Sequence, residues 1–324
     1  MNVQKLLFSI MTMCLLGSVN AQEAGWPSKP VKLVVPYSAG GPVDNLARAL
    51  SEKLGKIWHQ PVVVENRPGG NEIIGATAVA KAPGDGYTLL LATEAAATLN
   101  LYVFKKLPYD PIKELAPVTR VATANMMIAA SNNLPVNDLR GFVEYVKAHP
   151  GQVSYGSAGI GNGTHLAMAW FAKEHGLDMV HVPYKGLAPA LQDVMSGTIQ
   201  ATVGAASVIG PFVQSGHVKG LAINGARRAA ILPDVPTFAE AGFPNLDASF
   251  PFSLLASGGT PEAIRQKIYN DVKAVVMEEQ FRKQNLEQYA LDPVVDSPEE
   301  YAKSLVKDRQ IAAAKVKASG AQLE

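Results

Sequence analysis

Apolar residues recur along the first third of this chain in two alternating patterns, short β-branched runs and segments with helical spacing. The short runs predict strands, and segments in which apolar residues return every three or four positions predict helices. The predicted strands lie at 31–35, 62–64 and 89–91, and the predicted helices at 46–54 and 73–80. Gly55 is placed to end the first helix. The β-α-β-α-β order favours a parallel sheet with helices on its faces.

A second unit with the same alternation begins near residue 125. Its predicted strands lie at 126–130, 153–157, 179–182, 201–203 and 220–224, and its predicted helices at 139–146, 164–175 and 187–195. Strands and helices again alternate, so this unit also reads as an α/β unit.

The last part of the chain is mainly helical and follows a strand candidate at 253–256. Two segments read as helix starts, Thr260-Pro261-Glu262 and Ser297-Pro298-Glu299-Glu300, because each places a hydroxyl cap before proline and acidic residues. Glu300 stands where a capping box requires it. We therefore expect two α/β domains, with the final helices packed back on the first.

The first 21 residues have the pattern of a secretory signal peptide. Lys5 precedes an apolar stretch over 6–16, and the small residue Ala21 ends a Val-x-Ala triplet. We expect cleavage after Ala21 and export to the periplasm; the alternative is a buried N-terminal helix. The single cysteine, Cys14, lies in this stretch, so the mature chain would carry no disulfide and no thiolate site. Later apolar segments are too short or too interrupted to span a membrane.

The composition fits an exported globular protein with no nucleic-acid partner. The 324 residues are 48% hydrophobic and 18% charged, enough apolar material for the cores of about two domains. Lys and Arg number 29 against 28 Asp and Glu, a net charge of +1, and no basic run is present. This balance argues against nucleic acid and against an anionic membrane surface as partners.

Two glycine-rich loops share one construction, since each leads from a predicted strand into a predicted helix. They span 36–44 and 155–165. Glycines allow backbone amides to converge on one point, and the helix start adds partial positive charge, which together make an anion site without Lys or Arg. Ligands of open α/β sheets bind outside the carboxyl ends of the strands, where both loops would lie. The alternative is a pair of tight turns that bind nothing.

Signals for catalysis or metal binding are weak. Gly159 to Thr164 approaches G-x-G-x-x-G, but Thr164 stands in place of the third glycine. Around Ser157 the nucleophile-elbow pattern fails because Tyr155 replaces its first glycine. Three histidines match no zinc-ligand spacing: His165, His175 and His181. We therefore predict no catalytic residue, no metal and no cofactor.

Three single residues near the loops need separate interpretation. Asp44 would repel an anion, so we expect it to cap the start of the helix that follows the first loop. His165 stands at a helix start, where capping or packing is the alternative to ligand binding. Lys185 is either a cation of the ligand cleft or a solvated loop lysine.

Seven motifs give the chain a family resemblance. In chain order they are VVPYSAGGPVD (34–44), ENRPG (65–69), DGYTL (85–89), LPYDP (107–111), YGSAG (155–159), HVPYKG (181–186) and LPDVPT (232–237). With them the chain resembles the extracytoplasmic solute receptors of tripartite tricarboxylate transporters, also called Bug receptors.

The resemblance implies a two-domain, Venus-flytrap fold like that of type II periplasmic binding proteins. It implies residues 22–123 plus 247–324 as one domain and 124–246 as the other, with hinges near 122–126 and 244–253. It also implies a periplasmic monomer without catalysis. Such a receptor holds an organic acid, an aromatic acid or an amino acid by its carboxylate and delivers it to the membrane components of the transporter. A sensor that docks a histidine kinase and a secreted enzyme are the alternatives.

The loops and the resemblance together predict a ligand site formed by both domains. Its residues are Tyr37, Ser38, Ala39, Gly40, Gly41, Thr93, Glu94, Ser157, Ala158, Gly159, Gly161, Gly163, Thr164, His165, Lys185, Ala205, Ala206 and Ser207. The chain departs from the family pattern at Ala39, over 70–73, over 250–252 and at Glu94. An acid at Glu94 would oppose a second ligand carboxylate or would pair with an amine or hydroxyl.

Overall fold

The structure, a computed structural model, describes residues 25–244 and 249–321; the predicted signal peptide lies outside this range. The strands form one path in the order β2-β1-β3-β9-β4-β7-β5-β6, and β8 and β10 also pair with β4. The strands are β1 (Val31–Val35), β2 (Val62–Asn66), β3 (Thr88–Ala92), β4 (Leu115–Ser131), β5 (Val153–Ser157), β6 (Met179–Pro183), β7 (Ala201–Ala205), β8 (Val218–Ile223), β9 (Ser249–Ser257) and β10 (Leu291–Pro293).

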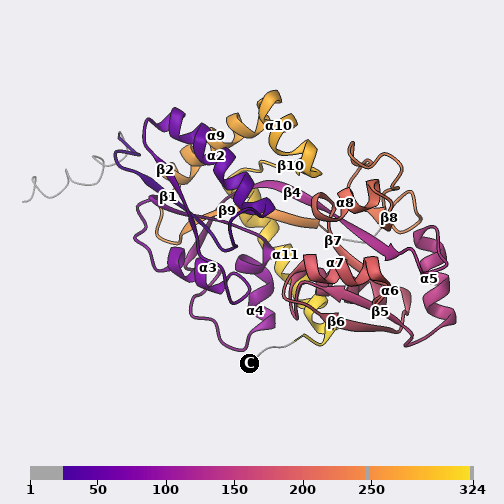
Figure 1. Cartoon of the computed structure of the whole chain (residues 1–324). Coiled ribbons are helices and arrows are strands. Elements are labelled where there is room, and N and C mark those ends of the chain that lie inside the picture. Colours follow the sequence, from indigo (N-terminus) through magenta and orange to yellow (C-terminus); the bar gives the residue numbers. More distant parts are fainter. Residues whose placement is uncertain (1–24, 245–248, 322–324) are drawn as a thin grey trace, which may run out of the picture.

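The helices cover both faces of this sheet (Figure 1). They are α2 (Pro42–Trp58), α3 (Ile73–Ala80), α4 (Asn100–Val103), α5 (Leu139–Ala148), α6 (Gly163–His175), α7 (Leu187–Ser196), α8 (Ala206–Gln214), α9 (Glu262–Met277), α10 (Glu279–Asn285) and α11 (Pro298–Ser319), with a π-helical turn η1 (Ala95–Leu99) and a 3₁₀ turn η2 (Glu287–Tyr289). Strands β1 to β3 with α2, α3, α9 and α10 form what we call the first lobe, and β5 to β8 with α5 to α8 form the second lobe.

The pairing within each lobe has the predicted parallel character. Strand β1 pairs in parallel with β2 and β3, and β5 pairs in parallel with β6 and β7. Helix α2 lies on the first-lobe sheet with Leu46, Leu50 and Leu54 buried, while Glu52 and Lys56 on its other face are exposed. Burying such leucines stabilises the fold by about 2 kcal/mol each.

Strand β4 connects the two lobes. Its residues 115–125 pair with β9, and its residues 126–130 pair with β7, all antiparallel. The sequence predicted only 126–130, because Pro117, Thr119 and Arg120 interrupt the apolar run before it. In the structure, the pairing with β9 has two irregularities in the same stretch. The partner of β4 therefore changes between Asn125 and Met126.

Three local predictions were wrong. Helix α2 continues past Gly55 to Trp58 and ends where His59 takes a left-handed conformation, with φ of 52°. Thr260 does not cap α9, since the capping position is Pro261 and the Thr260 hydroxyl is buried without a hydrogen-bond partner. Helix α8 was not predicted, because Gly210 and Pro211 obscure its helical pattern.

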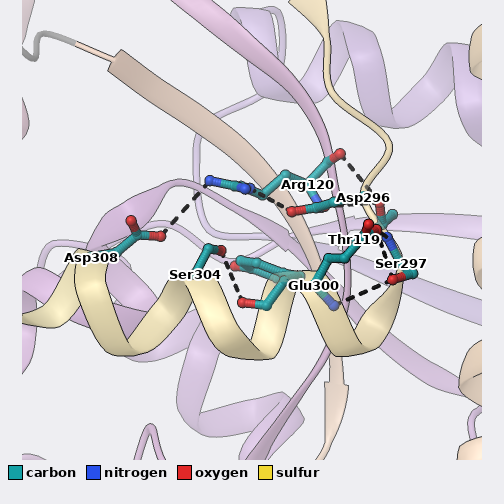
Figure 2. A network of polar contacts seen from close by, with 8 residues as sticks. Thr119, Arg120, Asp296, Ser297, Glu300, Ser304 and Asp308 are labelled. Carbon is teal, nitrogen blue, oxygen red and sulfur yellow. Dashed lines mark hydrogen bonds and ion pairs between the residues drawn. The ribbon is translucent and has the colours of Figure 1, made fainter.

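The capping box at the start of α11 is confirmed, and this helix contacts both lobes. The Ser297 N–H donates to Glu300 Oε2 at 2.8 Å, and the Glu300 N–H donates back to Ser297 Oγ at 3.3 Å. Nearby, Arg120 on β4 donates through Nε to Asp296 Oδ2 at 2.7 Å (Figure 2). The far end of α11 completes a small apolar cluster with residues of η1, α4 and α6: Leu99, Val103, Leu166, Ala312, Val316 and Ala321. The last helix thus packs on the first lobe, as expected, through Tyr301 and Leu305, and also contacts Leu166 of the second lobe.

Candidate functional site

A cavity of about 1020 Å³ receives residues from both lobes and from the strands that connect them. The two glycine-rich loops face it, the first through 36–43 and the second through Ala158, Gly159, Ile160, Asn162 and Thr164. Strands β4 and β9 contribute Met126, Phe250 and Phe252. The two loops, more than a hundred residues apart in sequence, thus border one space.

The cavity gathers ten of the eighteen predicted site residues. Those that line it are Tyr37, Ser38, Ala39, Gly40, Gly41, Ala158, Gly159, Thr164, Lys185 and Ala205. The residues that lie outside its lining are Thr93, Glu94, Ser157, Gly161, Gly163, His165, Ala206 and Ser207. The second group lies close to the loops or strand ends in the chain, which is why a reading by motif included it.

The first loop is held from beneath by Asp44. Gly40 has a φ of 88°, and its N–H donates to Asp44 Oδ2 at 2.9 Å. Arg48 Nε and Asn66 Nδ2 also donate to this carboxylate, at 2.9 and 2.8 Å. Burial raises the pKa of Asp44, but the hydrogen bonds from Arg48, Gly40 and Asn66 outweigh it and hold the pKa below its ordinary value. The prediction that Asp44 caps α2 was wrong, because Gly41 is the capping residue and receives no side-chain cap.

The first loop keeps backbone donors for a ligand. Within the described part of the chain, no acceptor bonds to the N–H groups of Ser38, Ala39 or Gly41. Helix α2 begins directly after them with Pro42 at its first position. The positive end of the helix dipole and three amides therefore lie at one edge of the cavity, an arrangement that attracts an anion.

The second loop uses most of its amides itself. Ala158 N–H donates to Thr164 Oγ1 at 2.8 Å, and Gly161 N–H donates to His165 Nδ1 at 3.2 Å. Thr164 N–H donates to Asn162 Oδ1, which caps α6. The similar sequences of the two loops thus give different chemistry, with the free donors concentrated on the first.

His165 is a packing residue beneath the second loop. It is 5% exposed, and its ring stacks on that of His181 at 3.8 Å with an angle of 6°. Burial, aided by the neighbouring His181, lowers the pKa of His165 to about 4, and burial also lowers the pKa of His181. Both rings are therefore neutral near pH 7.

Ser157 and His181 form a pair that sequence spacing could not reveal. Ser157 Oγ lies 2.7 Å from His181 Nε2, within hydrogen-bond distance. A serine beside a histidine is the first requirement of a hydrolase. Ser157, however, is fully buried and outside the cavity lining, so a substrate in the cavity does not reach its hydroxyl.

Gly161 and Gly163 allow the second loop and the start of α6 to approach α4 and β9 closely. A Cβ at Gly161 would lie 2.7 Å from Val103 Cγ1, and one at Gly163 would lie 2.6 Å from Phe250 Cε2. Both distances are shorter than real Cβ contacts, so neither position accepts a side chain unless its neighbour moves. These glycines serve packing between elements far apart in the sequence.

The acid of the cavity is Glu72, which the sequence flagged only as a departure from the family pattern. Glu72 lines the cavity and is 2% exposed. Glu94, expected there, lines a separate space of about 50 Å³ with Arg120, Asp308 and Lys315. Burial raises the pKa of Glu72, and burial together with the charge of Glu72 raises that of Tyr37.

The described residues offer no metal site and no helix able to cross a bilayer. No group of three or more His, Cys, Asp or Glu side chains is placed to hold a metal ion in that part of the chain. No helix there has the length and hydropathy of a membrane span. Two α/β lobes joined by shared strands around one ligand-sized cavity define the class of a two-lobed solute-binding receptor, like a periplasmic binding protein.

Comparison with known proteins gives the family. The chain belongs to the tripartite tricarboxylate transporter family receptors, whose model matches residues 46–319. Protein BugT of Bordetella pertussis is 30% identical over 331 residues, which cover 100% of both chains. The resemblance read from the seven motifs is thereby confirmed.

Solved structures agree with this assignment. Rpa4515 of R. palustris, with adipate, has a TM-score of 0.81 at 30% identity and covers 91% of this chain and 98% of its own. The periplasmic binding protein BugD has a TM-score of 0.78 at 30% identity, with 92% and 100% covered. The predicted two-domain, α/β periplasmic-binding-protein fold is confirmed, and receptors of this family are periplasmic solute-binding proteins.

Proposed function

We propose that this protein captures a small carboxylate between its lobes in the periplasm and presents it to the membrane components of a tripartite tricarboxylate transporter. The observation that carries the proposal is the first loop, whose Ser38, Ala39 and Gly41 amides border the cavity at the start of α2. Membership of the receptor family supports the transport role. The related Rpa4515, described with adipate, supports a carboxylate as ligand.

Binding begins at the first loop and is completed by closure of the lobes. The carboxylate accepts the loop amides, while Thr164 and Lys185 approach from the second lobe, since both line the same cavity. Micromolar affinity corresponds to about −8 kcal/mol, and each charge-assisted hydrogen bond contributes roughly 1.5–3 kcal/mol. Three amides and a cation, with apolar contacts, are enough to reach that value.

The domain boundaries follow the change of partners along β4. The proposed domains are 22–123 plus 247–324, and 124–246, with one hinge at 122–126. Support for this hinge comes from β4 itself, which pairs with β9 up to Asn125 and with β7 from Met126. Bending a strand where its partner changes leaves both ladders intact. The second hinge, proposed over 244–253, includes residues outside the described range.

The receptor acts as a monomer, without catalysis and without a cofactor, after cleavage of its signal peptide. The buried position of Ser157 favours binding over hydrolysis. Delivery to a transporter is favoured over docking to a histidine kinase by the family, whose members are named as transporter receptors.

Thermal unfolding with a panel of mono-, di- and tricarboxylates, aromatic acids and amino acids tests the function. A ligand at one hundred times its dissociation constant adds about 2.7 kcal/mol, a rise of several degrees for domains of this size. A rise with one class of acid supports the proposal. Absence of any rise, with no acid released from the denatured protein as purified, would contradict it.

A further inference from the structure

A second groove lies beside the ligand cavity, between α4 and the end of α11 (Figure 1). It has a volume of about 620 Å³. Its lining residues are Leu101, Tyr102, Val103, Phe104, Lys105, Ala313, Val316, Lys317 and Gly320. The lining is mainly apolar, and its two charged members, Lys105 and Lys317, are both positive. We call it the α4–α11 groove.

The lysines of the α4–α11 groove have no acidic partner in the described part of the chain. Lys105 and Lys317 are exposed, and so is Lys106, the residue that follows the lining. No carboxylate in residues 25–244 or 249–321 forms an ion pair with any of the three. The whole chain is nearly neutral, with 29 basic against 28 acidic residues. Three unpaired cations around one apolar groove are therefore a local feature, complementary to an acidic partner.

The α4–α11 groove is built on elements that also meet around a ligand. Phe104 lines both this groove and the ligand cavity. Val103 would lie 2.7 Å from a Cβ at Gly161, which belongs to the second loop. Val103 and Val316 also pack with Leu166 of α6 in one apolar cluster. A movement of the second lobe against α4 therefore changes the shape of the groove.

We infer that the α4–α11 groove is the surface by which the receptor docks on a membrane component of its transporter. The inference rests on the proposed function, because a receptor that delivers its ligand needs such a surface. The partner segment that fits carries acidic side chains for Lys105, Lys106 and Lys317 and an apolar side chain for the groove between them. Since Val103 contacts the second loop, docking depends on the position of the lobes.

An anionic membrane surface is the alternative occupant of the groove. Recognition of such a surface takes a cluster of about four to eight Lys or Arg residues, and three lysines border this groove. A concave apolar groove holds an inserted side chain, which a flat layer of headgroups does not provide. A protein segment therefore fits the groove better than a lipid surface does.

Charge reversal tests the docking surface. The variant Lys105→Glu with Lys317→Glu reverses both cations of the lining. Its matched control is Lys147→Glu with Lys173→Glu, which makes the same charge change on α5 and α6, at exposed lysines that form no ion pair in the described part of the chain. Each protein is supplied to cells that carry the transporter and lack their own copy of the receptor, with the acid at a saturating concentration.

Uptake of the acid is expected to fall about tenfold or more with the groove variant and to stay at the wild-type level with the control. Calorimetry is expected to show wild-type affinity for the acid in both. Undiminished uptake with the groove variant would overturn the inference and leave the proposed function intact. If the wild-type receptor binds an acid but supports no uptake of it, the transport role in the proposed function fails, and the docking surface fails with it.

Cross-linking identifies the occupant of the groove. Cys14 is the single cysteine of the sequence and lies in the predicted signal peptide, so Lys106→Cys places a benzophenone label at one defined site of the mature chain. Lys147→Cys is the control, on α5 at the far side of the second lobe from α4 (Figure 1). Irradiation with transporter-containing membranes and bound acid is expected to join the Lys106→Cys protein, and not the control, to a membrane component.

Two results of these experiments would overturn the inference. One is cross-linking to a membrane component at equal yield from both sites. The other is binding of the wild-type protein to phosphatidylglycerol vesicles without any transporter, lost in the groove variant, which would assign the groove to lipid.

Discussion

The side chain of Asp44 accepts a hydrogen bond from the backbone N–H of Gly40, four residues earlier, at 2.9 Å. The acid thereby orients the loop that offers its remaining amides to the cavity. Arg48 Nε bonds the same carboxylate oxygen at 2.9 Å and offsets its negative charge. This geometry explains why an acid lies so close to an anion site. Asp44 accepts one loop amide, Arg48 neutralises its charge, and the other loop amides remain available to the ligand.

Replacing Asp44 with asparagine should loosen the first loop. The new amide nitrogen would replace one of the two carboxylate oxygens and would face two donors there, either Gly40 N–H and Arg48 Nε or Arg48 Nη2 and Asn66 Nδ2. The free energy of unfolding should therefore fall by about 2 kcal/mol. Carboxylate affinity should fall about tenfold with it, measured by calorimetry. Glu279→Gln, which breaks an exposed i,i+4 pair with Lys283, is the matched control and should change neither quantity. Wild-type affinity in a folded Asp44→Asn protein would contradict the role of Asp44.

A methyl group at Gly163 should weaken ligand binding through the contact between α6 and β9. The added Cβ would meet Phe250 Cε2 at 2.6 Å, and Phe250 lines the ligand cavity. Overpacking of this kind costs about 1–3 kcal/mol, so Gly163→Ala should bind roughly tenfold more weakly. Calorimetry on the double variant with Phe250→Leu should show partial recovery.

Gly141→Ala is the control for that experiment. Gly141 lies in α5, where a Cβ would have 3.4 Å to its nearest neighbour, Asp138 Oδ1. Alanine favours the helix there, so binding and stability should be retained. The account of Gly163 is wrong if both alanine variants bind as the wild type does.

The histidine stack should make stability depend on pH. The pKa of His165 is about 4 in the folded protein and near 6.5 when unfolded, so between these values the unfolded state binds more protons. Stability is complete above pH 6.5 and declines as the pH falls toward 4. From pH 7 to pH 5 the loss from His165 should be about 2 kcal/mol.

Denaturant unfolding at both pH values measures this loss. His165→Asn keeps an acceptor for Gly161 N–H and should remove the part of the slope that His165 contributes. Burial also lowers the pKa of His181 and of His175, so these residues keep their own part. His59→Asn is the control, since His59 is exposed and left-handed, a conformation that asparagine tolerates. A slope that His165→Asn leaves unchanged, or that His59→Asn reduces as much, would contradict this account.

Local periodicity was enough to predict most elements of both lobes. Strand 153–157 and helix 73–80 have the same bounds in the structure, because apolar spacing and flanking glycines are local signals. The sequence did not predict the first two-thirds of strand β4. This part pairs with β9, more than a hundred residues later in the chain, and its sequence carries Pro117 and Arg120. Tertiary pairing overrides local pattern in such a strand.

The site was predictable in place but not in detail. That two loops meet at one cavity follows from the carboxyl ends of parallel strands. The roles of Gly163 and His165 depend on Phe250 and His181, which no local pattern associates with them. The sequence analysis expected Glu94 as the acidic residue of the cavity. In the structure Glu72 lines the cavity instead, and the N–H groups of Thr93 and Ala96 hold its carboxylate in place.

The central claim, that the first loop binds the carboxylate, is tested most directly by titrating three proteins with the tightest acid of the panel. Gly40 has a φ of 88° and open space around an added Cβ, and it lines the cavity; Gly216 has a φ of 72° and equally open space, outside the lining. Gly40→Val and Gly216→Val therefore impose the same backbone strain. The account predicts that Gly216→Val binds as the wild type does and that Gly40→Val loses binding by about a hundredfold, near 2.7 kcal/mol. Equal affinity in a folded Gly40→Val protein would contradict it.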